Sequence, residues 1–142
     1  MKHIKAFTYK PKIEFVLNGL CKQTIRPFNQ NIKIGDEILF HGWKRVPYKS
    51  EWSWRFEVNL TNVINIEIRN NGIIFPKWRD LIILWSHELI NKLAIDDFIS
   101  PPTGIGLRDL FNEMYDLREP KYFQILRWGE DNSYNLKSNE II

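Results

Sequence analysis

Two neighbouring stretches decide the fold of this chain. Residues 19–27 read GLCKQTIRP, and residues 32–40 read IKIGDEILF. Gly19 stands where a helix would end, because glycine readily takes the left-handed conformation that closes many helices. Pro27 limits the following extended piece to a sheet edge or a turn. In the second stretch, Gly35 and the aspartate after it predict a turn that leads into a strand.

The extended piece after Gly19 carries polar residues at alternate positions. In a strand, successive side chains point to opposite faces. Thr24 and Arg26 should therefore lie on one face, while Ile25 points into the core. This is the arrangement that a small binding or acyl-transfer site on a strand would need.

The sequence before these stretches predicts a short strand over residues 4–9 and then a helix. Pro11 fits the first turn of that helix, where its missing N–H costs little. Apolar residues follow at helical spacing at Ile13, Val16, Leu17 and Leu20. After the second stretch, residues 54–68 and 73–75 are rich in β-formers. They flank residues 70–72, Asn-Asn-Gly, which we expect to form a hairpin turn because Asn and Gly tolerate positive φ.

The C-terminal half has a helical character. Asp80 is expected to cap a helix that runs to about Ala94, and residues 95–106 are expected to form a loop. A further helix shows one apolar stripe, and residues 122–128 fit a final buried strand. The members of the stripe are Leu107, Leu110, Phe111, Met114 and Tyr115. Short strands with one early helix and two late helices predict an α+β fold with a curled antiparallel sheet.

Composition supports one globular domain, over residues 1–128, with a polar tail over 129–142. Hydrophobic residues make up 44% of the 142 residues and charged residues 26%, which is ordinary for a folded domain. The single cysteine excludes an internal disulfide, and the three histidines lack metal-ligand spacing, so neither a metal nor a cofactor is expected. The longest apolar run, residues 81–85, is too short to cross a bilayer, and no signal peptide is visible. These features predict a cytoplasmic protein.

Positive charge is concentrated in the first part of the chain. Residues 1–50 contain ten Lys/Arg and three Asp/Glu, a balance of +7, whereas the remaining residues carry −4. Such a basic half can supply a phosphate-facing surface, because phosphate contacts come chiefly from Lys and Arg. The same lysines could equally be solvated surface charges.

The stretches over residues 19–27 and 32–40 resemble the ASCH superfamily. Its members have a glycine and a lysine at the end of the first helix, then Thr-x-Arg, and after a short gap a Gly-Asp that starts a core strand. The resemblance implies a PUA-like curled β-barrel of about five to seven mostly antiparallel strands around a cleft. The family includes RNA-binding members and small amidohydrolases that remove the acetyl group from N4-acetylcytidine.

The resemblance also implies the residues of a site. The threonine of the hydrolase members corresponds to Thr24, and the glutamate corresponds best to Asp96, with Asp97 as its neighbour. The lysine position falls on Cys21, and a lysine follows one residue later at Lys22.

The first functional hypothesis is a domain that binds RNA or a modified nucleoside in a basic cleft. The guanidinium group of Arg26 presents several N–H donors in a geometry that suits a phosphate group or the edge of a base. Basic and aromatic residues alternate further along, a combination that suits an unpaired base held by stacking. The predicted nucleic-acid-binding residues are Lys22, Arg26, Trp43, Lys44, Arg45, Tyr48 and Trp52.

The second hypothesis is an N4-acetylcytidine amidohydrolase. Thr24 would be the nucleophile, Lys22 would accept its proton, and Asp96 would serve the leaving amine. The Cys21 thiol is interpreted as a small buried hydrophobe rather than a nucleophile. A third alternative is an interaction domain that has kept the fold and lost the site. The sequence makes no prediction of oligomeric state.

Overall fold

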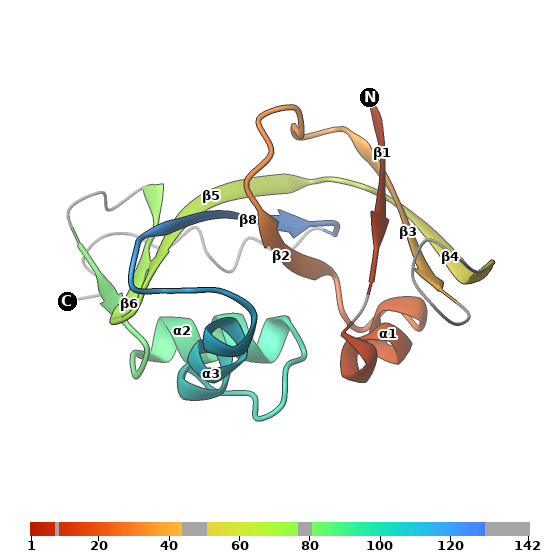
Figure 1. Cartoon of the computed structure of the whole chain (residues 1–142). Coiled ribbons are helices and arrows are strands. Elements are labelled where there is room, and N and C mark those ends of the chain that lie inside the picture. The colour runs from red at the N-terminus through yellow and green to blue at the C-terminus, as the bar shows by residue number, and fades with distance from the viewer. Residues whose placement is uncertain (8, 44–50, 77–80, 130–142) are drawn as a thin grey trace.

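The structure is a computed structural model that describes residues 1–7, 9–43, 51–76 and 81–129 (Figure 1). The side chains of residues 10, 11, 43 and 53 lie outside this description, as does the predicted tail from residue 130 onward. The strands are β1 (Lys2–Ala6), β2 (Gln23–Pro27), β3 (Glu37–Trp43), β4 (Trp52–Asn59), β5 (Asn62–Arg69), β6 (Gly72–Ile74), β7 (Ile83–Leu84) and β8 (Lys121–Arg127). The helices are α1 (Lys10–Leu17), α2 (Glu88–Asp96) and α3 (Gly104–Met114).

The strands form two sheets, which are connected where β4 leads into β5. One sheet has the order β1-β3-β4 and the other β2-β8-β5-β6-β7. All pairings are antiparallel except that of β1 with β3. The chain runs from β4 into β5 across Leu60 and Thr61, so the two sheets continue into one another as an arch (Figure 1).

All three helices lie on one side of this arch. Figure 1 shows α1 beneath the three-stranded sheet, and α2 and α3 beneath the five-stranded sheet. Two hydrophobic clusters correspond to these halves. One joins α2 and α3 to strands β5, β6, β7 and β8, and the other joins α1 to β3, β4 and the end of β8. The α+β class, the mostly antiparallel pairing, and the one early and two later helices are therefore confirmed.

The predicted curled barrel is not found in the described residues. The edge strands β1 and β2 belong to different sheets, and no ladder joins them in the part of the chain that the structure describes. The strand order instead leaves an open seam between these two edges. The site described below lies along this seam.

The helix boundaries correct two expectations. The first late helix begins at Glu88, where the His87 side chain accepts a hydrogen bond from the Leu89 N–H, and not at Asp80, which lies outside the described residues. The last helix begins three residues earlier than expected, because Thr103 caps the Gly106 N–H and extends α3 into the predicted loop.

The β5–β6 hairpin forms where the sequence predicts it, but for a different reason. Arg69 pairs with Gly72 across a turn of two asparagines, and neither asparagine has a positive φ. Gly72 is needed because a Cβ there would lie 2.1 Å from the carbonyl oxygen of Ile83 on β7. The glycine thus permits close pairing with β7, a strand that the sequence did not predict.

Candidate functional site

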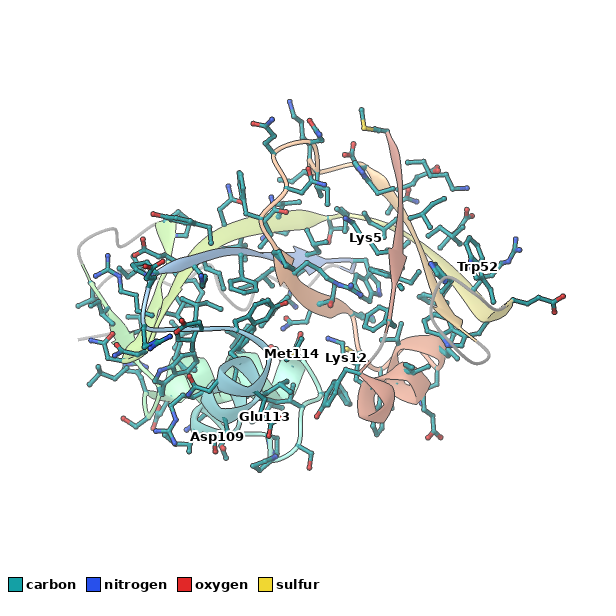
Figure 2. The ribbon with its side chains drawn as sticks, viewed as in Figure 1. Lys5, Lys12, Trp52, Asp109, Glu113 and Met114 are labelled. Atoms are coloured by element: carbon teal, nitrogen blue, oxygen red, sulfur yellow. The ribbon has the colours of Figure 1, made fainter. Side chains whose placement is uncertain are left out.

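A cavity of about 320 Å³ opens at the seam, between α1, α3 and β2. We call it the aromatic cavity, because four of the described residues on its wall contribute aromatic rings: Phe7, Tyr9, Phe111 and Tyr115. Its aliphatic wall is made by Ile25, Pro27, Leu107, Leu110 and Met114. Three charged side chains complete the lining, namely Lys12, Arg26 and Asp97. Figure 2 shows Lys12 in the space between α1 and α3, with Met114 beside it on α3.

Lys12 and Asp97 form a buried ion pair on the cavity wall. The Lys12 Nζ donates to Asp97 Oδ1 at 3.0 Å, and the two side chains are only 3% and 8% exposed. Lys12 reaches this position because it lies one helical turn before Val16, on the face of α1 that packs inward. Leu17 and Leu20, which the sequence assigned to the apolar face, are exposed instead.

The backbone after α2 fixes the carboxylate opposite Lys12. Asp97 is the C-terminal cap of α2, and Phe98 follows it with a φ of 54°. This left-handed conformation costs a non-glycine residue about 1–2 kcal/mol. The Phe98 ring packs 4.7 Å from the Phe15 ring of α1, which ties the end of α2 to the helix that carries Lys12.

A chain of buried hydrogen bonds holds Asp97 from the other side. Gln23 Nε2 donates to Asp97 Oδ1 at 3.3 Å, and Arg127 donates to Gln23 Oε1 at 3.0 Å. Both hydrogen bonds to Asp97 therefore reach one oxygen. Among the described residues, Asp97 Oδ2 has no hydrogen-bond donor. This oxygen is the acceptor that the site can offer to a ligand.

Burial raises the pKa of the Asp97 carboxyl, and Lys12, Gln23 and Arg26 oppose that rise. A carboxylate in these surroundings binds a proton more readily than one in water. The same side chain can therefore accept a hydrogen bond when ionised and donate one when protonated.

Arg26 lies at the end of the cavity, where its charge is only partly satisfied by protein groups. Its Nε donates to Thr24 Oγ1 at 3.3 Å, and its guanidinium carbon lies 4.7 Å from the centre of the Phe7 ring. Burial lowers the pKa of Arg26, opposed by Asp97 and Tyr115. The terminal guanidinium nitrogens have no hydrogen-bond acceptor among the described residues.

A second, more open cavity of about 520 Å³ adjoins the first at Arg26 and Pro27. We call it the loop cavity, because residues 28–31 form much of its wall, with Lys5 of β1 on the other side. Figure 2 shows Lys5 on the side of β1 that faces β2. The two cavities together run along the seam between these strands.

Thr24 and Arg26 are neighbours on β2, as the alternation in the sequence predicted. Thr24 is buried, however, and it is not among the described residues that line the aromatic cavity. Lys22 is exposed and also absent from the described lining. Asp96 is half-buried with an ion-pair distance of 4.0 Å to Lys92, and its neighbour Asp97 provides the carboxylate on the cavity wall.

Cys21, which the resemblance to the ASCH superfamily aligns with a lysine, is fully buried. Its thiol donates to the Gln23 carbonyl at 3.4 Å, and burial raises its pKa. Lys12 opposes that rise, which places the ammonium group within electrostatic reach of Cys21. The sequence does not predict Lys12 as a site residue, because a lysine early in a helix is usually solvated.

Trp52, the one aromatic side chain of the predicted binding surface within the described residues, does not line either cavity. A bulge at Gly42/Trp43 shifts the register of β3 against β4, so Trp52 shares a face with His41 rather than with Trp54. The Trp52 ring stacks 4.0 Å from His41, and in the view of Figure 2 Trp52 lies on the opposite side of β1 from Lys5 and Lys12. Of the other predicted residues, Lys44, Arg45 and Tyr48 and the side chain of Trp43 lie outside the described residues.

The described residues contain no group of three or more His, Cys, Asp or Glu that could hold a metal ion. No helix among them is long and apolar enough to cross a membrane.

No protein-family model, curated protein or solved structure matches this chain. The resemblance to the ASCH superfamily therefore stays a prediction. Function is inferred below from the two cavities and the side chains that line them.

Proposed function

We propose that this protein binds a single nucleoside unit, free or within RNA, in the aromatic cavity. The observation that carries the proposal is the wall of that cavity, where four aromatic rings stand next to Lys12, Arg26 and Asp97. Aromatic rings stack on bases of any sequence, and nearby cations add to that attraction. A volume of about 320 Å³ lies at the small end of ligand sites, which suits one base with its sugar.

The charged groups favour a base that presents both a donor and acceptors. Asp97 Oδ2 can accept a hydrogen bond from an exocyclic amine, while Lys12 and Arg26 can donate to ring acceptors beside it. Cytosine offers such an edge, with its N4 amine next to acceptor atoms. Cytidine and its N4-acetyl derivative are therefore the first ligands to test.

We also propose that the fold is of the ASCH type and PUA-like. Two observations support this assignment of the fold. The Thr24-x-Arg26 pair follows the first helix directly on an edge strand, and Arg26 borders the cavity. The seam between β1 and β2 is then the cleft of the domain.

The test is isothermal titration of cytidine, with uridine and ribose as comparisons. Met114 lines the aromatic cavity and is 56% exposed, so Met114→Trp narrows the mouth without disturbing the core. We expect this variant to weaken cytidine binding by about tenfold or more, which corresponds to about 1.4 kcal/mol. Ile105→Trp is the matched control, because Ile105 is exposed on the same helix and is absent from the described lining. Equal affinities in the two variants, or no binding by the native protein, would reject this site.

A second candidate function is the hydrolysis of N4-acetylcytidine. It is favoured by one observation, the lysine–carboxylate pair on the cavity wall, in which Lys12 lies within electrostatic reach of the position that holds the family's lysine. In this mechanism Arg26 first moves away from the buried Thr24 Oγ1, to which its Nε donates at 3.3 Å, so that the hydroxyl opens to the cavity. Thr24 Oγ1 then attacks the acetyl carbonyl, and the Lys12–Asp97 pair takes up its proton. The pair returns that proton to N4 as the C–N bond breaks. Water then releases acetate from the acetyl-threonine.

A chromatographic time course of N4-acetylcytidine distinguishes the hydrolase from a simple binder. The hydrolase should produce cytidine with the native protein and with Thr24→Ser, which keeps a hydroxyl, but not with Thr24→Val. No conversion by any of the three proteins at high concentration would reject the activity. Retained binding in that case would support the binding function, and loss of both would favour an interaction domain.

A further inference from the structure

We propose that the loop cavity is a subsite for a phosphate group attached to the nucleoside in the aromatic cavity. The ligand class is then a nucleotide, either free or within a strand, rather than an unphosphorylated nucleoside. This inference rests on the proposed function and adds the chemical group that the adjoining cavity recognises.

The charge of the loop cavity favours an anion. Its described lining contains two cations, Lys5 and Arg26, and no carboxylate. Lys5 is half-buried and has no ion-pair partner among the described residues. The terminal nitrogens of Arg26 are likewise without a described acceptor, and a guanidinium fork matches two phosphate oxygens. Neither cation has a carboxylate at ion-pair distance among the described residues, so the loop cavity favours an anion.

Hydrogen bonds to β8 hold residues 28–31, the loop that forms the cavity wall, in place. The buried Gln124 on β8 accepts a hydrogen bond from the Asn29 N–H at 3.2 Å and donates to the Asn29 carbonyl at 3.1 Å. The Asn29 side chain in turn accepts from the Asn31 N–H at 2.9 Å. Phe28 adds a bond from its N–H to the Tyr122 carbonyl. A loop tied down at successive residues loses little entropy when a ligand binds.

The position of the loop cavity fits a phosphate linked to the same ligand. Arg26 and Pro27 line both cavities, so a group in one cavity lies directly beside a group in the other. The volume of the loop cavity, about 520 Å³, is larger than one phosphate group would fill. Phe28 on its wall is 47% exposed and can stack on the next base of a strand.

The test compares four probes by isothermal titration: cytidine, cytidine 3′-monophosphate, cytidine 5′-monophosphate and the dinucleoside monophosphate CpC. We expect at least one phosphorylated probe to bind about tenfold more tightly than cytidine, with a gain that shrinks as salt is raised. Lys5→Gln should remove most of this gain and leave the affinity for cytidine unchanged. Lys33→Gln is the matched control, because Lys33 is exposed and absent from the described lining of both cavities.

Each outcome bears on a separate claim. Tighter binding of CpC than of either monophosphate identifies a strand as the source of the phosphate, and equal binding identifies a free nucleotide. Equal affinity for cytidine and all phosphorylated probes would overturn the subsite and leave the nucleoside site standing. The same loss in Lys33→Gln as in Lys5→Gln would also overturn it, since the effect would then come from diffuse charge. Absence of binding by all four probes would reject the proposed function as well.

Discussion

Replacing Lys12 by methionine removes the ammonium group from the buried pair and keeps a side chain of similar length. Asp97 is then left with one described donor, Gln23, in a site where burial already raises its pKa. The carboxylate can stay charged without a cation, or it can take up a proton. Breaking one side of a buried ion pair commonly costs about 3–5 kcal/mol.

The free energy needed to protonate the Asp97 carboxylate limits the loss of stability that Lys12→Met can cause. A carboxyl with the ordinary pKa of 3.8 requires about 4.4 kcal/mol to be protonated at pH 7, because each pH unit corresponds to about 1.36 kcal/mol. At pH 5 the same step requires only about 1.6 kcal/mol. Lys12→Met should therefore lower the free energy of unfolding by about 4 kcal/mol at pH 7 and by less than about 2 kcal/mol at pH 5.

Urea denaturation of the native protein and the variant at both pH values measures these differences. The double variant Lys12→Met/Asp97→Asn should be more stable than Lys12→Met alone at pH 7, because it leaves no unpaired carboxylate. A loss below about 1 kcal/mol that does not change with pH would refute the buried pair.

Three further predictions concern the fold. Gly72→Ala should lower the free energy of unfolding by about 2–3 kcal/mol in urea denaturation, because its Cβ would overlap the Ile83 carbonyl. Gly35→Ala should lower it by about 1 kcal/mol, because Gly35 has a φ of 91° but open space around it. A larger loss for Gly35→Ala than for Gly72→Ala would contradict the close β6–β7 pairing. The pKa of Asp36 is lowered to about 2 from an ordinary 3.8, so its contribution to stability is present above pH 3.8 and is lost as pH falls toward 2. Acid denaturation of Asp36→Asn should show a shallower loss of stability over this range, and an unchanged profile would count against the hydrogen bonds of the Asp36 carboxylate with the His3 ring and the Lys33 N–H. The buried Cys21 thiol should react with a disulfide reagent only after unfolding, and rapid labelling of the native protein would show that it is accessible.

Local features of the sequence predicted local features of the structure. Gly19 and Gly35 both have positive φ, and each stands at the turn that its sequence context indicated. Thr24 and Arg26 share a face because the period of a strand is fixed by its backbone. These relations involve residues only a few positions apart, which is why the sequence alone could predict them.

The centre of the candidate site depends on contacts that are distant in sequence. Lys12 and Asp97 are separated by 85 positions, and the burial of each is tolerable only because the other is present. The separation of Trp52 from Trp54 depends on a bulge, which alternation in one strand does not reveal. The sequence predicted candidate residues on β2, whose Arg26 lines the cavity, but it predicted Lys22 and Asp96 where the structure places Lys12 and Asp97 on the cavity wall.

Whether a nucleoside binds in the seam between β1 and β2 is best tested by a two-dimensional NMR titration of the labelled protein with cytidine and then with cytidine 5′-monophosphate. We expect cytidine to shift the backbone signals of residues around the aromatic cavity, on β2, α3 and the start of α1. The phosphorylated ligand should extend these shifts to Lys5 and residues 28–31. Shifts confined to the face that carries Trp52, or no shifts with either ligand, would contradict a nucleoside site in the seam between β1 and β2.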